Sequence, residues 1–347
     1  MKGKITILIL AVASLLAVSC TEKGYVKVVG YAQGGTYTVT FNMEGVSLPA
    51  EEVRNGIDSI LNQIDVTLSG YNHNSLLSRF NAGDTVIVDH MFAEIYSRAY
   101  EVYEETQGAV DVSFSPLYDM WGFGFRNGSL PSERQVDSVM NFCGMQRLRK
   151  TMSDLIGAPI LSSVLSDGMF DPQLNYNAIA QGYSCDLVAE YLYSIGVNDM
   201  MVNIGEIFCD GKNPSGVAWN IGIDRPEDGN DQPGAQLQEI FAVPEGPHGV
   251  VTSGNYRKFY IRDGKKYAHT VDPRTGYPVS HNLLSATIIA ENALLADAYA
   301  TYCMVIGLEE AKAFIESRED IEGCLVYDQD GEFVTWCSEG LETRKAD

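Results

Sequence analysis

Apolar residues recur along this chain with two different spacings, and these spacings outline its elements. Strand-like patterns are expected over residues 25–43, 200–210 (broken at Gly205) and 219–223, and in a terminal hairpin over 324–336. Helical spacing predicts helices over 49–68, 92–106, 132–142, 294–307 and 309–318, and another that ends near Ser194. The sequence contains no internal repeat and no low-complexity linker. We therefore expect an α+β (mixed α/β) fold, with mixed sheets flanked by helices, in a single globular unit of one or two lobes.

The first residues have the pattern of a secretory signal. Lys2 and Lys4 precede the apolar run 5–18, which is shorter than the ~20 residues that cross a bilayer. Small residues then lead into Cys20, as in a bacterial lipobox, where the cysteine is lipidated and becomes the new N-terminus. An ordinary signal peptide with an incidental cysteine is the alternative. We expect a signal peptide over 1–19, a lipidated cysteine and tether over 20–30, and export to a bacterial membrane, with the protein lipid-anchored and facing the periplasm.

Composition narrows the class of protein. A net charge of −22 at pH 7 repels phosphate backbones, so we expect no nucleic-acid partner. An apolar share of 45% is ample for a core and does not indicate disorder. The cysteines after Cys20 form no CxxC pair. Export would allow a disulfide, but the sequence leaves its pairing open.

The first candidate site is a pair of oxygen donors inside an apolar helix. Asp297 and Thr301 are four residues apart, which places carboxylate and hydroxyl one turn apart on one face. Such hard donors suit Mg²⁺, which takes few protein ligands and leaves positions for substrate phosphates. Without a metal, the same residues would be a carboxylate favoured by the helix dipole and a threonine bonded back to its own helix.

The second candidate is the segment HTVDPRTG (269–276), where a β-like run enters a turn at Asp-Pro and Thr-Gly. The aromatic run 121–125 suits either a wall around a flat cofactor or core packing. Tyr71, in a polar loop, suits stacking on a planar ligand. The pair Gly34–Gly35 fits a hairpin turn, a bulge or a closely approaching ligand. No GxSxG elbow surrounds Ser253, which argues against a serine hydrolase.

Five stretches, in this order, resemble the ApbE family of FAD:protein FMN transferases. They are GAVD (108–111), SPLxxxWGFG (115–124), TSGNY (252–256), HTVDPRTG (269–276) and ADAYAT (296–301). The resemblance runs from about Gly34 to Cys303, and it implies an ApbE-like flavin transferase domain over 31–347.

The resemblance also implies an activity and a site. Enzymes of this family cleave FAD with Mg²⁺, release AMP, and attach FMN to a Thr or Ser hydroxyl of an acceptor protein. The expected acceptor is a flavoprotein subunit of a membrane electron-transport complex with a Ser/Thr-Gly-Ala-Ser/Thr motif. His269 matches the residue that activates the acceptor hydroxyl. Asp297 is expected to be catalytic and, with Thr301 and the backbone carbonyl of Ser184, to bind Mg²⁺. The matching FAD-contacting positions are Gly34, Tyr71, Ala109, Val110, Asp111, Gln181, Leu187, Thr270 and Val271.

Four positions depart from the family pattern: Gly34 stands where Met is common, Asn175 where Asp is usual, Gln181 where Lys or Glu is common, and Glu206 where Gly is usual. Two other functions would use nearly the same residues. One is a metal-dependent FAD pyrophosphatase, with water as the acceptor. The other is a non-catalytic flavin-binding lipoprotein, which would have no need of His269. The chain is a poor acceptor itself, because its Gly-Ala pairs follow Gln107, Ile156 and Pro233.

The lipobox interpretation has a direct test. If Cys20 carries the lipid, Cys20→Ser should accumulate as a precursor of higher polypeptide mass that no longer partitions with the membrane. Fractionation and intact-mass measurement check this. An unchanged membrane fraction together with an unchanged mass would contradict it.

Overall fold

A computed structural model describes residues 19–20, 24–123, 130–227, 230, 234–255, 259–262 and 265–346. Several sequence-based expectations concern residues outside this set. These are the signal sequence over 1–18, the end of the aromatic run at Gly124 and Phe125, and the last residue of TSGNY (Tyr256). The dipeptide Asp263–Gly264, whose sequence predicts a turn between two short strands, also lies outside this set.

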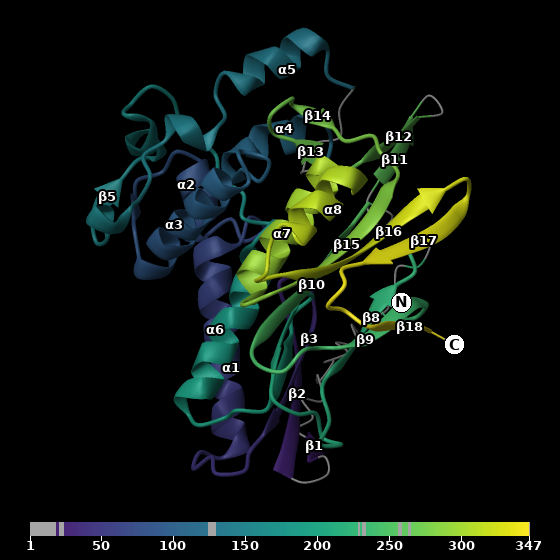
Figure 1. Ribbon diagram of the computed structural model, residues 1–347. Helices are drawn as coiled ribbons and strands as arrows, with labels where there is room; N and C mark the ends of the chain where they lie inside the picture. Colours follow the sequence, from purple (N-terminus) through teal and green to yellow (C-terminus); the bar gives the residue numbers. More distant parts are fainter. Residues whose placement is uncertain are drawn as a thin grey trace, which may run out of the picture.

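A large antiparallel sheet is the central element of the fold (Figure 1). Its nine strands lie in the order β1-β2-β3-β6-β7-β10-β15-β16-β17. They are β1 (Ser19–Cys20), β2 (Tyr25–Ala32), β3 (Gly35–Asn42), β6 (Met200–Asn203), β7 (Ile207–Asp210), β10 (His248–Gly254), β15 (Leu283–Ala290), β16 (Glu322–Gln329) and β17 (Glu332–Cys337). Strand β1 includes Ser19, the last residue of the predicted signal peptide, and both β1 and the start of β2 fall in or next to the stretch 20–30 assigned to the tether.

Smaller sheets complete the strand content. A three-stranded sheet has the order β18-β9-β8, from Thr343–Lys345, Leu237–Ala242 and Asn220–Asp224. Three two-stranded pairs are β4 (Val86–Ile87) with β5 (Pro159–Ile160), β11 (Phe259–Arg262) with β12 (Lys265–Ala268), and β13 (Val271–Asp272) with β14 (Tyr277–Pro278).

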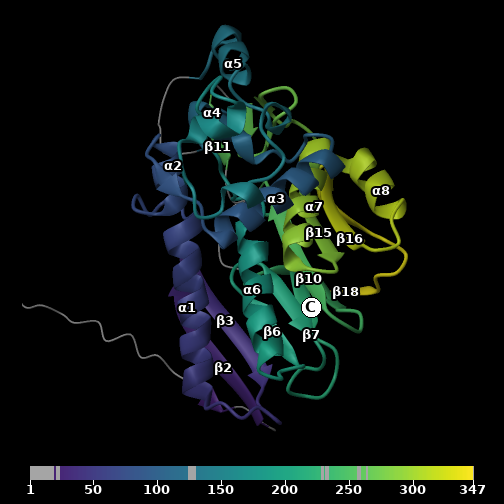
Figure 2. The ribbon, with the colours of Figure 1, turned by 90° about the vertical axis from the view of Figure 1, so that its left-hand side faces the viewer.

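Helices cover one face of the large sheet. In Figures 1 and 2, α1, α6, α7 and α8 lie against this face, and α2 to α5 gather beyond the upper end of α1. The bounds are α1 Ala50–Leu68, α2 Leu76–Asn81, α3 His90–Glu105, α4 Ser115–Met120, α5 Glu133–Met140, α6 Ala180–Ser194, α7 Ala293–Ile306 and α8 Leu308–Glu316. Every helix predicted from apolar spacing is confirmed, with ends that shift by one or two residues at most.

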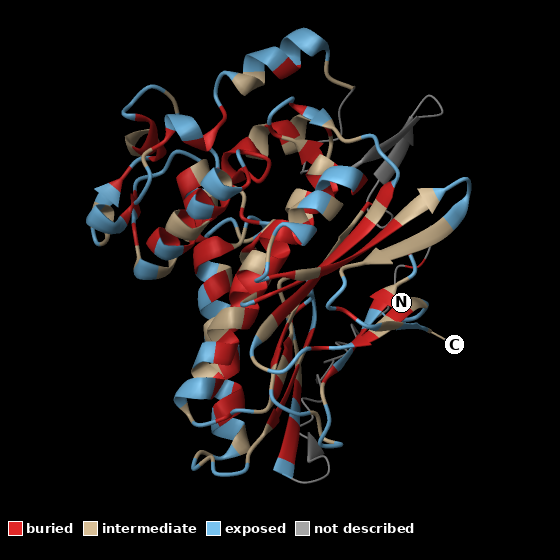
Figure 3. Cartoon of the chain, viewed as in Figure 1, coloured by how far each residue is buried: buried red, intermediate tan, exposed pale blue. Residues whose placement is uncertain are grey.

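The middle of the large sheet is buried on both faces (Figure 3). In β15, Ile288 packs in a core with Tyr299 of α7 and Ile315 of α8. Its neighbour Ile289 points the other way, into a core shared with Phe241 of the small sheet. A strand buried on both faces has a continuous apolar run instead of alternation, and β15 is such a strand.

Helix α7 lies at the centre of this arrangement. It packs against α6, α8, β10, β15 and β13, and most of its residues are buried. A helix enclosed on so many sides is apolar all round, which explains its alanine-rich sequence. Asp297 stands out here because it is a buried charged residue among apolar neighbours. Within the described residues, no helix is both long enough and apolar enough to cross a membrane.

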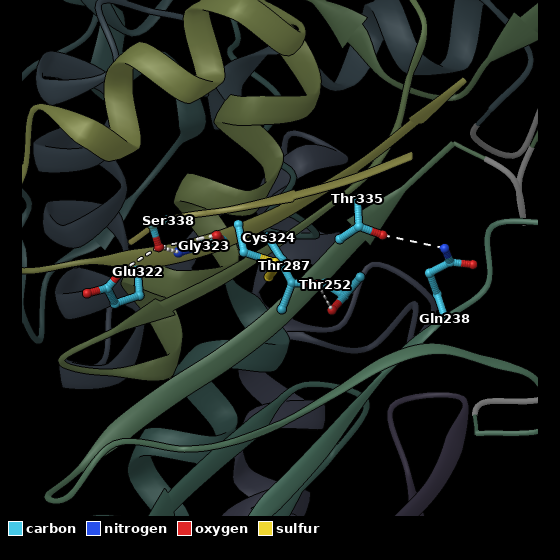
Figure 4. Close-up of a disulfide and its surroundings, with 9 residues drawn as sticks. Gln238, Thr252, Thr287, Glu322, Gly323, Cys324, Thr335 and Ser338 are labelled. Carbon is cyan, nitrogen blue, oxygen red and sulfur yellow. Dashed lines mark hydrogen bonds between the residues drawn. A yellow bond between two sulfur atoms is a disulfide. The ribbon is translucent and has the colours of Figure 1, made fainter. Parts of the chain in front are cut away.

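A disulfide closes the edge of the large sheet (Figure 4). Cys324 on β16 and Cys337 on β17 are directly opposed and bonded, which gives the pairing that the sequence leaves open. On the other side, Cys324 is in register with Thr287 of β15, whose hydroxyl lies 2.8 Å from that of Thr252 on β10. The cysteines at 143, 185, 209 and 303 are free and buried.

We expect this disulfide to stabilise the protein chiefly by restricting the unfolded chain. With the cysteines 13 positions apart, reduction should lower the free energy of unfolding by about 3 kcal/mol. Urea denaturation with and without reductant measures the change. The Cys324→Ala/Cys337→Ala variant is the control, because reductant should not affect it. Equal midpoints for the oxidised and reduced parent protein would contradict a stabilising role.

Candidate active site around helix α7

A carboxylate on α6 fixes the N-terminus of α7. Asp186 accepts hydrogen bonds from the backbone N–H groups of Ala293 (2.7 Å) and Leu294 (2.9 Å). The side chain of Asn292 accepts a third bond, from the N–H of Leu295 (2.8 Å). These acceptors satisfy N–H groups that have no partner inside the helix, and a negative charge is favourable at this end. Burial raises the pKa of Asp186 to about 7, although its bonds from α7 oppose the shift.

Two glycines allow α7 to lie unusually close to its neighbours. A Cβ on Gly182 of α6 would lie 2.2 Å from the carbonyl oxygen of Ala293. A Cβ on Gly249 of β10 would lie 2.3 Å from the Cα of Ala293. Any side chain at either position would push the helix away. Because the helices are so close, the N–H of Gly182 reaches Asp297 and donates to its Oδ2 at 3.2 Å.

Asp297 is a buried carboxylate that lacks a positive partner. Its side chain is 5% exposed, and burial raises its pKa, with the N–H of Gly182 opposing the shift. Within the described part of the chain, the N–H of Gly182 is its only hydrogen-bond donor, and no basic side chain pairs with it. Asn292 and Asp186 already serve the helix N-terminus, so the helix dipole does not account for Asp297. A bound cation would compensate this carboxylate.

Thr301 follows Asp297 by one helical turn. Its Oγ1 lies 3.5 Å from Oγ of Ser253 on β10, so the hydroxyl faces the sheet and is not bonded back into its own helix. Ser184 lies inside α6, where its hydroxyl donates to the carbonyl of Ala180 (2.6 Å). The part of Ser184 expected to bind metal is its carbonyl, and that role stays a prediction. The available donors are oxygens, which suit Mg²⁺. Within the described residues, no group of three or more His, Cys, Asp or Glu side chains forms a metal site.

The segment that carries His269 is bonded to the large sheet through a neighbouring residue. The hydroxyl of Thr270 donates to Oδ1 of Asn255 at 2.7 Å, and both residues are buried. The ring of Phe123 meets the imidazole of His269 edge to face, with centroids 6.5 Å apart. His269 itself is partly exposed, which an acceptor hydroxyl would require.

The turn after His269 is held by the aromatic run. Trp121 donates from Nε1 to the carbonyl of Gly276 (2.8 Å), and its ring centroid lies 5.6 Å from that of Tyr277. Gly276 has φ of 81°, a left-handed conformation that favours glycine. Arg274 donates from Nε and one terminal nitrogen to the two oxygens of Asp272, at 2.9 Å each. At Trp121, therefore, the aromatic run serves core packing, whereas Phe123 reaches the candidate site.

Some predicted FAD-contacting residues lie beside this assembly. Gln181 precedes Gly182 in α6 and donates to the carbonyl of Ile204 (3.1 Å). Gly34 lies in the tight turn between β2 and β3, so the hairpin alternative is confirmed for the glycine pair. The side chain of Gln33 in this turn donates to the hydroxyl of Ser184, which brings the turn next to α6. Thr270 and Val271 follow His269 directly.

The other predicted FAD-contacting residues are either exposed in a loop, packed in or beside a core, or hydrogen-bonded within the local fold. Tyr71 is 71% exposed in the loop after α1, and Leu187 packs at the margin of the main core. Ala109 and Val110 are buried. Asp111 accepts from the N–H (2.8 Å) and hydroxyl (2.6 Å) of Ser113 and from the N–H of Met145 (3.0 Å), so its carboxylate stabilises the local fold. Flavin contact at these positions stays a prediction.

The structure adds Gln33 and Asn255, to which sequence reasoning gave no role, and it gives Phe123 and Ser253 specific partners in the site. Ser253 and Asn255 are two apart at the end of β10, and such spacing places side chains on one face of a strand. This two-residue spacing is the feature of the sequence that could have indicated their shared position. Gln33 has a left-handed φ of 50°, which nothing in the sequence indicates for a glutamine.

Comparison with known proteins agrees with this arrangement. Residues 33–325 match the model of the ApbE family. A FAD:protein FMN transferase of Vibrio cholerae is 31% identical over 321 residues, covering 90% of this chain and 91% of the relative. A FAD:protein FMN transferase of Escherichia coli K12 is 32% identical over 293 residues, covering 83% and 80% respectively.

A solved structure shows the same fold. The apo form of the flavinyl transferase ApbE from Pseudomonas stutzeri superposes with a TM-score of 0.77 at 31% identity, covering 92% of this chain and 96% of that one. The matched region of the family model contains both Asp297 and His269. The chain therefore belongs to the ApbE family.

Proposed function

We propose that this protein transfers FMN from FAD to a Thr or Ser hydroxyl of an acceptor protein, with Mg²⁺ bound at Asp297 and Thr301. The observation that carries the proposal is the link between the two polar clusters. Thr301 faces Ser253 near the end of β10, and Asn255 on the same strand end binds the residue next to His269. The activity named for the relatives is the same transfer.

The proposed reaction breaks one phosphoanhydride bond and forms one phosphoester. The acceptor oxygen attacks the phosphorus of the FMN half of FAD, and AMP leaves with the bridging oxygen. His269 takes the proton of the hydroxyl as the new bond forms. A magnesium ion at Asp297, Thr301 and the carbonyl of Ser184 would reduce the negative charge of the pyrophosphate. That compensation matters on a chain whose net charge is −22.

Two other functions remain as alternatives with distinct outcomes. A FAD pyrophosphatase would release free FMN at the same rate with or without acceptor protein. A non-catalytic flavin-binding lipoprotein would leave FAD intact. Incubation with FAD, Mg²⁺ and an acceptor domain, followed by in-gel flavin fluorescence after denaturation, separates all three. The proposed acceptor carries a Ser/Thr-Gly-Ala-Ser/Thr motif in a flavoprotein subunit of a membrane electron-transport complex.

We also propose that the protein works outside the cytoplasm, facing the periplasm and anchored through lipidated Cys20. The disulfide Cys324–Cys337 supports an oxidising compartment, where such bonds form and persist. The membrane partner in this proposal is the lipid bilayer that holds the anchor.

The metal assignment is tested at Asp297. Asp297→Asn keeps the size of the side chain and an acceptor for the N–H of Gly182, but removes the negative charge. We expect a folded variant with little transfer at low Mg²⁺ and partial recovery at high Mg²⁺, because mass action offsets weakened affinity. Thr301→Val should show a milder shift of the same kind. Activity titrated against Mg²⁺ measures both shifts.

Melting curves provide the control for Asp297. If the residue only stabilises the helix, the variant should melt at a lower temperature while its Mg²⁺ titration coincides with that of the parent protein. Coincident titrations would end the metal assignment.

The role of His269 is tested by separating binding from transfer. His269→Ala should still bind FAD but transfer FMN roughly 10²–10⁴-fold more slowly, as expected for a lost general base. FAD binding is measured by fluorescence and transfer by the in-gel assay. A variant that transfers at the parent rate, or that loses FAD binding, would show that this role is wrong.

A further inference from the structure

We propose that Asn255 is a positioning residue that fixes His269 at a set distance from the metal-binding face of α7. This inference rests on the proposed function, since it concerns the residue that activates the acceptor. Its starting observation is the hydrogen bond from the hydroxyl of Thr270 to Oδ1 of Asn255, at 2.7 Å. Each residue is only 8% exposed, so water competes little for this bond.

Asn255 is itself held firmly by the large sheet. Strand β10 pairs with β15 up to Gly254 opposite Ser285. The N–H of Asn255 then donates to the carbonyl of Leu284 at 2.9 Å and so continues the ladder by one residue. Its amide group thus projects from a backbone that is hydrogen-bonded in the sheet, as a positioning residue requires.

The same end of the strand also reaches the proposed metal site. Ser253 is two residues before Asn255, and its Oγ lies 3.5 Å from Oγ1 of Thr301. Two residues along a strand span about 6.6–6.8 Å, with side chains on the same face. The end of β10 therefore contacts the metal-binding face of α7 through Ser253, and Asn255, the residue just after the strand, contacts the segment that carries His269.

Among the described residues, the same segment also makes contacts within its hairpin and with neighbouring helices. The N–H of Val279 donates to the carbonyl of Thr270 (3.0 Å), and Val271 packs with Trp121 and Val136. These contacts hold the β13–β14 hairpin together and attach it to α4 and α5, and β13 also packs against α7. Removing the amide of Asn255 would leave the hairpin folded and packed on these helices, but it would remove the hydrogen bond that ties Thr270, the neighbour of His269, to the sheet.

Two simpler roles for Asn255 make different predictions. A residue that contacts FAD directly would alter FAD affinity and the KM for FAD. A residue that only stabilises the fold would lower the melting temperature, with no specific effect on kcat. A positioning residue lowers kcat for transfer and leaves FAD affinity nearly unchanged, because a shift of about 1 Å in a catalytic group costs roughly 10²-fold in rate.

The test removes each partner of the hydrogen bond and then both. We expect Asn255→Ala and Thr270→Val each to lower kcat for transfer roughly 10–100-fold. For Asn255→Ala, the FAD dissociation constant should stay within about 2-fold of the parent value. The double variant should be no slower than the slower single variant, because both changes remove one interaction. Asn255→Asp and Thr270→Ser keep an acceptor and a donor, respectively, and should recover most of the rate.

Thr252→Val is the matched control. Thr252 also makes a hydroxyl bond from β10, to the buried Thr287, but from the opposite face of the strand. It should lower the melting temperature in the same way as the Asn255 and Thr270 variants, yet keep the parent kcat. All rates are measured well below the lowest melting temperature.

The outcomes separate this inference from the proposed function. If the parent protein attaches no FMN to the acceptor, the proposed function fails, and the role of Asn255 fails with it. If the parent protein transfers FMN, three results overturn the role of Asn255 alone. These are unchanged kcat in both single variants, a raised KM for FAD at unchanged kcat, or an equal loss of kcat in Thr252→Val.

Discussion

The contact between α6 and the N-terminus of α7 is the constraint on which the rest of the site depends. Asp186 binds two N–H groups of α7, and Gly182 lets the helices approach until its own N–H reaches Asp297. The same contact that positions the helix therefore orients the carboxylate. A polar group deep in an apolar helix is costly, and here the backbone of the neighbouring helix offsets part of that cost.

The site combines two parts of the structure, and the end of β10 contacts both of them. The sheet and α7 carry the oxygen donors, while His269 lies just before the β13–β14 hairpin, which packs on α4, α5 and α7. The end of β10 touches both parts, through Ser253 and Asn255. This division suits a reaction with two substrates. The nucleotide needs a rigid binding surface that compensates the negative charge of its phosphates. The acceptor needs a general base that another protein can reach.

The sequence reveals the local features of this protein far better than its long-range contacts. The spacing of Asp297 and Thr301 indicates a shared helix face without any structure, because helical geometry alone decides it. β15 and the pairing of Cys324 escape detection, since burial on both faces removes alternation and a disulfide depends on register. Asp186, Gly182 and Asn255 act on residues 107, 115 and 15 positions away, so no local pattern reveals them.

The bond between Gln33 and Ser184 joins residues 151 positions apart, and β3 pairs directly with β6. Closing such long loops costs chain entropy before the contacts that reward it can form, so a fold of this kind assembles slowly and cooperatively. A chain truncated before α7 would lack Asp297, which accepts the hydrogen bond from the N–H of Gly182. We therefore expect nucleotide affinity to arise only in the completed fold, which makes binding of FAD a measure of successful folding.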